Sequence, residues 1–131
     1  MNNRAFGRMS DVTPLVLLAN AIAAHWPEGR VLDTLHAPFA AADAPATTDR
    51  AFYEPLAALR LPRTVRFAAG FAHEAQSLDY QMEIRSIVEG HLQREVMISA
   101  ACGLGRRTED AGRAVLERTA ELCAARSGTD D

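Results

Sequence analysis

The sequence predicts a single α/β domain with a parallel sheet of about three strands and flanking helices. Three short apolar segments of strand length alternate with segments whose apolar residues recur at helical spacing. The resulting order, helix–strand–helix–strand–helix–strand–helix, is typical of a parallel sheet with right-handed crossovers. An apolar fraction of 48% is ordinary for a globular domain and too high for a disordered chain.

The first half of the chain contains one helix, one strand and a long loop. The helix begins near Thr13, a good N-cap residue, with Pro14 at its first position. Residues 30–37 form the first predicted strand. Residues 39–49 are rich in small and turn-forming residues and predict a mobile loop suited to act as a lid or insertion. A short helix over residues 50–59 follows.

The second half contains two further strands, each followed by a helix. Residues 64–71 form the second predicted strand, in which Gly70 permits close approach of another chain segment. Ser77 caps a helix that runs to about residue 92. Residues 96–101 read as a strand buried on both faces, because the run is almost unbroken in its apolar character. The last helix begins at Thr108, with acidic residues in its first turn.

Composition and charge argue against several classes of function. The 14 basic and 17 acidic residues are mixed along the chain without a basic patch, so we expect no nucleic-acid binding. No segment has the roughly 18 consecutive apolar residues of a membrane span, so we expect no membrane insertion. Cys102 ends a predicted strand and Cys123 lies in a predicted helix, a poor arrangement for a disulfide. We therefore expect a reduced, cytoplasmic protein. We also expect a single domain over residues 11–126, preceded by a flexible segment over residues 1–10 and followed by one over residues 127–131.

Residues of chemical interest end each predicted strand. His36 ends the first strand, His73 and Glu74 end the second, and Cys102 ends the third. Because the carboxyl ends of parallel strands meet at one edge of a sheet, we expect these side chains to gather there. Zinc accepts Cys and His ligands, and a thiol beside an imidazole also becomes a reactive thiolate. We therefore predict Cys102 and His36 as metal ligands and His73 and Glu74 as acid/base groups, although Cys102 would also suit an apolar core position.

Other residues at these strand ends also have structural alternatives. His36 could hydrogen-bond a loop carbonyl, and His73 with Glu74 could form a solvated loop pair. Arg106 and Arg107, in the turn before the last helix, could hold an anion or could be a solvated pair flanking that helix. The sequence leaves these alternatives open.

The segment Ala101–Arg106, with its Cys-Gly-Leu-Gly core, resembles the end of the last barrel strand in proteins similar to the catalytic domain of cobalamin-independent methionine synthase. Four further segments resemble, in the same order, successive pieces of an uncharacterised bacterial branch of that superfamily: Leu18–Ala24, Leu35–Pro38, Phe52–Pro62 and Ala69–His73. The resemblance covers roughly residues 13–125 and corresponds to the last three strand–helix units, that is, a partial TIM barrel.

The resemblance implies a fold, a cofactor and an activity. In that superfamily the fold is a (β/α)8 barrel, and zinc activates a thiol substrate for methyl transfer. The resemblance implies Cys102 as a zinc ligand, His73 as a residue near the substrate, and His36 near the place of an acidic zinc ligand. The His-x-Cys pair that supplies two further ligands in methionine synthases is absent from this sequence.

Two classes of function follow. The first is a barrel-derived α/β protein that binds a small-molecule ligand or metal at the strand ends, with any activity related to thiol or methyl transfer. The alternative is a non-catalytic protein-interaction module, a remnant of a barrel enzyme, or a subunit that completes a barrel or oligomer with a separate chain. Three strands taken from a barrel leave one sheet face and two edges uncovered. Those surfaces predict a homo-oligomer or a complex with a partner protein, unless the first helix and the loop over residues 39–49 cover the face.

Overall fold

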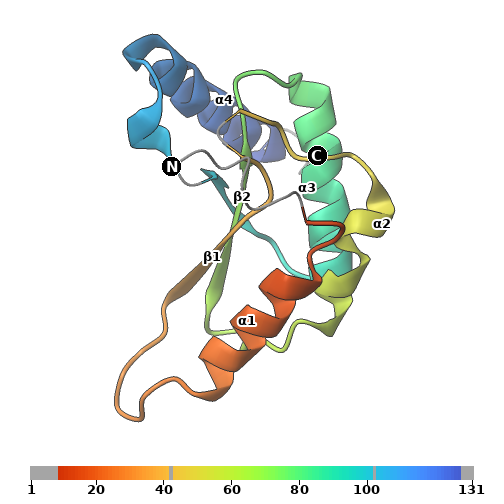
Figure 1. Cartoon of the computed structure of the whole chain (residues 1–131), viewed down its shortest axis with the longest axis vertical. Coiled ribbons are helices and arrows are strands. Elements are labelled where there is room, and N and C mark those ends of the chain that lie inside the picture. Colours follow the sequence, from red (N-terminus) through yellow and green to blue (C-terminus); the bar gives the residue numbers. More distant parts are fainter. Residues whose placement is uncertain (1–8, 42, 102, 128–131) are drawn as a thin grey trace.

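The computed structural model describes residues 9–41, 43–101 and 103–127. In this part of the chain, four α-helices flank a three-stranded parallel sheet of order β1-β2-β3, so the predicted α/β fold is confirmed (Figure 1). The strands are β1 (Thr34–Pro38), β2 (Arg66–Ala72) and β3 (Met97–Ala100). The helices are α1 (Thr13–Ala24), α2 (Arg50–Tyr53), α3 (Leu78–Leu92) and α4 (Glu109–Ser127), with short 3-10 helices η2 (Glu54–Ala58) and η3 (Leu104–Arg106).

All strands of the sheet run in the same direction. Leu35 of β1 pairs with Phe67 of β2, and Ala69 of β2 pairs with Ile98 of β3. The register between β2 and β3 shifts between Gly70 and Ala72, as it does at a β-bulge. The carboxyl ends of the strands therefore lie along one edge, which is the arrangement that the predicted site requires.

Within the described residues, the helices pack against one face of the sheet, whereas His36 and Met97 on the other face are exposed. Successive side chains of a strand point to opposite faces, and Leu35 and Phe67 are buried in the core on the helical side. On the opposite face His36 is exposed, and Met97 keeps 43% of its surface accessible. Helix α1 joins the same core as Leu35, through Val16 and Ala19 among others, so it does not cover the open face.

The predicted N-cap residue is confirmed for α3 and wrong for α1. Ser77 caps α3 as predicted, because its hydroxyl oxygen accepts a hydrogen bond from the backbone N–H of Tyr80 at 3.3 Å. Thr13 is not the cap of α1. The cap position is Val12, and the carboxylate of Asp11 accepts from the N–H of Thr13 at 2.8 Å. Pro14 has no N–H to donate, and Asp11 satisfies the N–H of Thr13, which has no acceptor within the helix.

The loop over residues 39–49 is anchored in the core. Phe39 and Ala46 are 6% and 3% exposed. The hydroxyl of Tyr53 donates to the carbonyl oxygen of Thr47 at 2.6 Å, which ties the end of the loop to α2. Residue 42 of this loop lies outside the described residues, and a lid role for the loop stays a prediction. Most of the predicted loose ends, at residues 1–10 and 127–131, also lie outside the described residues.

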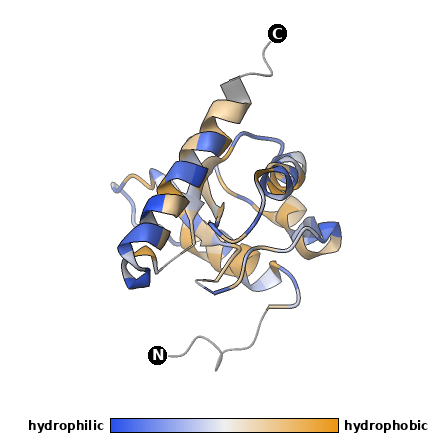
Figure 2. Ribbon diagram, turned by 90° about the horizontal axis from the view of Figure 1, so that it is seen from above, coloured by the Kyte–Doolittle hydropathy of each residue, from blue (hydrophilic) through white to orange (hydrophobic). Residues whose placement is uncertain are grey.

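Hydropathy follows this layered arrangement. In Figure 2 the hydrophobic residues concentrate where strands and helices meet, while hydrophilic and hydrophobic bands alternate along α4, which leads to the C-terminus. No helix in the described part of the chain is long and apolar enough to span a membrane.

Candidate functional site

His36 reaches from β1 across β2 to the end of β3. Its Nε2 lies 3.1 Å from the carbonyl oxygen of Ala100. A carbonyl oxygen only accepts, so Nε2 carries the proton and Nδ1 keeps a free lone pair. Gly70 makes this crossing feasible, because a Cβ built there would lie 2.7 Å from His36 Nε2. The prediction that Gly70 permits close approach is confirmed, and His36 does bind a carbonyl, although the carbonyl belongs to a strand and not to a loop.

The replacement Gly70→Ala should lower the free energy of unfolding by about 1–2 kcal/mol. The added methyl would lie 3.1 Å from the carbonyl oxygens of Ala37 and Ala100 and would displace His36. Urea denaturation measures the change. The control is Gly90→Ala, whose methyl meets nothing within 4 Å and which should stabilise α3 by about 0.5–1 kcal/mol. Equal shifts of both variants would contradict the steric explanation.

At the end of β2 His73 is buried and Glu74 is half-buried, so the alternative of a solvated loop pair is wrong for His73. His73 is 2% exposed, and its Nδ1 lies 3.5 Å from Glu74 Oε2. The same Nδ1 accepts a hydrogen bond from the backbone N–H of Ala75 at 3.0 Å. In this tautomer the proton lies on Nε2, which is buried and has no hydrogen-bond partner among the residues that the structure describes.

Arg107 completes this cluster from the turn before α4. Its Nε donates to Glu74 Oε1 at 3.1 Å and to Oε2 at 3.3 Å, and only 4% of its side chain is exposed. Its terminal nitrogens Nη1 and Nη2 are buried without a partner in the described part of the chain. Arg106 is exposed, so the solvated-pair alternative fits Arg106 and is wrong for Arg107.

The charge of Glu74 is stabilised by its neighbours. Burial alone would raise the pKa of this carboxyl. Hydrogen bonds from the backbone N–H of Glu74 itself and from Arg107 act in the opposite direction, and so does the positive charge of Arg107. The net effect holds the pKa of Glu74 below its ordinary value, so the carboxylate is ionised at neutral pH.

Gln81, on α3, holds the loop that carries His73 and Glu74. Its Oε1 accepts from the backbone N–H of His73 at 3.0 Å, and its Nε2 donates to the carbonyl oxygens of His73 and Gln76, each at 2.8 Å. Arg118 of α4 also donates to the carbonyl oxygen of Gln76. No sequence motif marks Gln81 or Arg118 as a functional residue. The one available signal is a glutamine at helical spacing from Ile84, on the buried face of α3.

The predicted site residues therefore separate into two groups. His73 and Glu74 lie together with Arg107, whereas His36 lies over Gly70 on the open face of the sheet. Cys102 is outside the described residues, so its predicted roles as zinc ligand or thiolate stay predictions. Within residues 9–41, 43–101 and 103–127, no three His, Cys, Asp or Glu side chains are grouped to hold a metal ion. His36 fits one ligand position, because a ligating His commonly donates its other N–H to a backbone carbonyl.

Comparison with known proteins gives no match: no protein-family model, no curated protein sequence and no solved structure is similar to this chain.

Proposed function

We propose that the protein binds a small anionic ligand, of the carboxylate or phosphate class, at the carboxyl ends of β2 and β3. One observation supports this proposal above all others. The Arg107 guanidinium is buried with Nη1 and Nη2 unpartnered among the described residues, and the buried Nε2 of His73 lacks a partner in the same cluster.

Unpaired buried donors are unfavourable unless something binds them. Each buried polar group left without a partner costs about 1–3 kcal/mol, and charged groups cost more. Glu74 engages only Nε of Arg107, so the outer fork of the guanidinium remains available. Such a fork matches the paired oxygens of a carboxylate or phosphate. An anion that accepts from Nη1 and Nη2 would remove this cost, which explains why the protein can retain these donors.

The predicted catalytic role of His73 and Glu74 belongs to the same proposal. Glu74 contacts both His73 and Arg107, so a ligand on Arg107 would lie close to the acid/base pair. A barrel-derived origin and an activity related to thiol or methyl transfer are proposed from the resemblance to methionine synthases. Arg107 directly follows Ala101–Arg106, the segment that resembles the end of the last barrel strand in those proteins.

The replacement Arg107→Gln should weaken anion binding at least about tenfold, because it removes the charged fork. Isothermal titration calorimetry with inorganic phosphate and with a dicarboxylate such as malonate measures the affinity. Arg113→Gln is the matched control, because Arg113 is 67% exposed and pairs with Glu109 on the surface of α4. If the unmutated protein bound neither anion, or if both variants bound equally well, the proposal would fail.

Metal binding is a second candidate and is favoured by the fixed tautomer of His36. With Nε2–H donated to Ala100, Nδ1 is the ring nitrogen left to bind a metal, because a ligating His commonly donates its other N–H to a backbone carbonyl. The sequence places Cys102 two residues after Ala100. Zinc titration should show affinity reduced about tenfold or more in His36→Ala and Cys102→Ser, but not in His25→Ala, a change at an exposed position. Absence of zinc binding by the unmutated protein would remove this candidate.

The open sheet face favours self-association as a non-catalytic alternative. Met97 and His36 are exposed on that face, and β1 and β3 are edge strands. A parallel sheet normally has both faces covered. Light scattering should therefore detect a dimer or larger oligomer that Met97→Glu dissociates. A monomer at millimolar concentration would contradict this alternative.

A further inference from the structure

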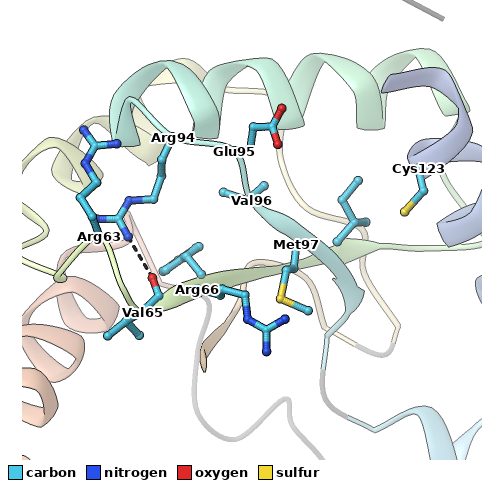
Figure 3. Close-up of a pocket in the computed structure, with 10 residues that line it drawn as sticks. Arg63, Val65, Arg66, Arg94, Glu95, Val96, Met97 and Cys123 are labelled. Carbon is cyan, nitrogen blue, oxygen red and sulfur yellow. Dashed lines mark hydrogen bonds between the residues drawn. The ribbon is translucent and has the colours of Figure 1, made fainter. Parts of the chain in front are cut away.

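A half-open cavity lies at the opposite end of the sheet, at the start of β2 and β3 (Figure 3). Its volume is about 560 Å³, within the range typical of small-molecule sites. The residues that line it are Arg63, Val65, Arg66, Phe67, Arg94, Glu95, Val96, Met97, Ile98 and Cys123. It shares no lining residue with the His73–Glu74–Arg107 cluster, so it is a separate site.

The floor of this cavity is apolar and preformed. Val65, Phe67 and Val96 are between 2% and 4% exposed and belong to the main core. Because close packing fixes these side chains, they cannot collapse into the cavity. Ile98 extends this apolar surface toward Cys123, whose exposed thiol lies on α4. The accessible apolar surface of the cavity comes mainly from Met97, which is 43% exposed, and from the partly buried Ile98.

Positive charge gathers at one end of the cavity. Arg94 donates through Nη1 to the carbonyl oxygen of Val65 at 3.0 Å, as Figure 3 shows, and Arg63 donates to the carbonyl oxygen of Gln93 at 2.8 Å. Neither guanidinium forms a salt bridge within the described residues. Burial, and in addition the like charge of Arg63, lower the pKa of Arg94. An anion at this end would offset that repulsion.

We infer that this cavity binds an amphipathic anion, with its carboxylate at Arg63 and Arg94 and its acyl chain along the apolar floor. Arg66 is paired with Asp33, but Arg63 and Arg94 outnumber the single glutamate of the lining, Glu95, so the lining keeps a net positive charge that complements the headgroup. Charge at one end and apolar surface along the rest match a medium-chain fatty acid better than a uniformly polar ligand. A second copy of the chain added to the free edge of β3 is the competing occupant.

The rate at which Cys123 reacts with a thiol reagent provides a local test, because a ligand in the cavity should shield this thiol. The chain has two cysteines, so Cys102→Ser leaves Cys123 as the single thiol for a colorimetric disulfide reagent. Decanoate, below its micelle concentration, should slow the reaction of Cys123 in a saturable way, whereas acetate and decanol should protect far less. Calorimetry with decanoate on the unmutated chain should give the same dissociation constant.

Arg63→Gln should raise the decanoate concentration needed for half protection about tenfold, and the surface variant Arg113→Gln should leave it unchanged. Arg94 is left intact, because its guanidinium also holds the carbonyl oxygens of Leu61 and Pro62. Absence of protection, or equal protection by decanol, would overturn the inference. If Cys123 became protected in the absence of decanoate, and more so as the protein concentration rose, the cavity would be assigned to a second copy of the chain.

Discussion

Replacement of Gln81 by leucine should lower the free energy of unfolding by about 3 kcal/mol. Gln81 is 0% exposed and makes three hydrogen bonds to the backbone of the loop over residues 73–76. Leucine is similar in size but cannot replace these bonds, so the N–H of His73 and two carbonyl groups lose a partner, each at about 1–3 kcal/mol. Arg118 also donates to both carbonyl oxygens, so the expected loss lies at the lower end of the summed range.

Thermal denaturation followed by circular dichroism measures this loss, which we expect to lower Tm by roughly 10 °C. The control is Glu83→Leu, an exposed position on the same helix, where the change should stay within about 0.5 kcal/mol. In the Gln81 variant the loop over residues 73–76 should also exchange its amide hydrogens faster. A Tm equal to that of the control variant would show that Gln81 does not hold this loop.

Replacement of Glu74 by glutamine should have opposite effects on stability and on anion binding. Glu74 provides the carboxylate that faces the buried guanidinium of Arg107, and removal of one partner of a buried ion pair is strongly destabilising. Glu74 keeps 22% of its side chain exposed, so we expect a loss of about 2 kcal/mol, below the full buried value. The same change removes a negative charge near the proposed ligand, so phosphate should bind about fivefold more tightly.

Urea denaturation and calorimetry, both at 10 °C to keep the variant folded, measure these two effects. Glu109→Gln is the matched control, because Glu109 is 87% exposed in its pair with Arg113 and should change neither quantity appreciably. A purely structural role for the cluster predicts the stability loss with no change in anion affinity. Tighter binding in Glu74→Gln together with weaker binding in Arg107→Gln would identify the cluster as the anion site.

Local sequence signals predict most of the backbone organisation. The alternation of strand-length and helical segments predicts the parallel α/β fold, and Ser77 marks the start of α3. The ends of helices and strands are harder to predict from local signals, because they depend on contacts with neighbouring segments. Residues 50–59 read as one helix, but the α-helix ends at Tyr53 and a 3-10 helix follows, since Pro55 supplies no N–H to continue it.

The candidate site was predicted only in part. His73 and Glu74 could be selected because they follow a strand, and Arg107 was recognised as an alternative anion-binding residue. Their burial could not be predicted, because it depends on contacts between distant segments. Arg107 meets Glu74 across 33 residues of chain, and Arg118 reaches Gln76 across 42. No local pattern encodes such separations.

The sequence by itself thus determined the class of fold, the order of its elements and the small residue at position 70 that lets His36 cross β2. These features follow from hydrophobic periodicity and backbone sterics, which act over a few residues. Only the tertiary structure decided that Arg107 is buried, that Gln81 holds the loop after β2, and that a cavity opens at the amino ends of the strands. Burial, hydrogen bonding and cavity shape depend on which distant side chains the packed helices bring together.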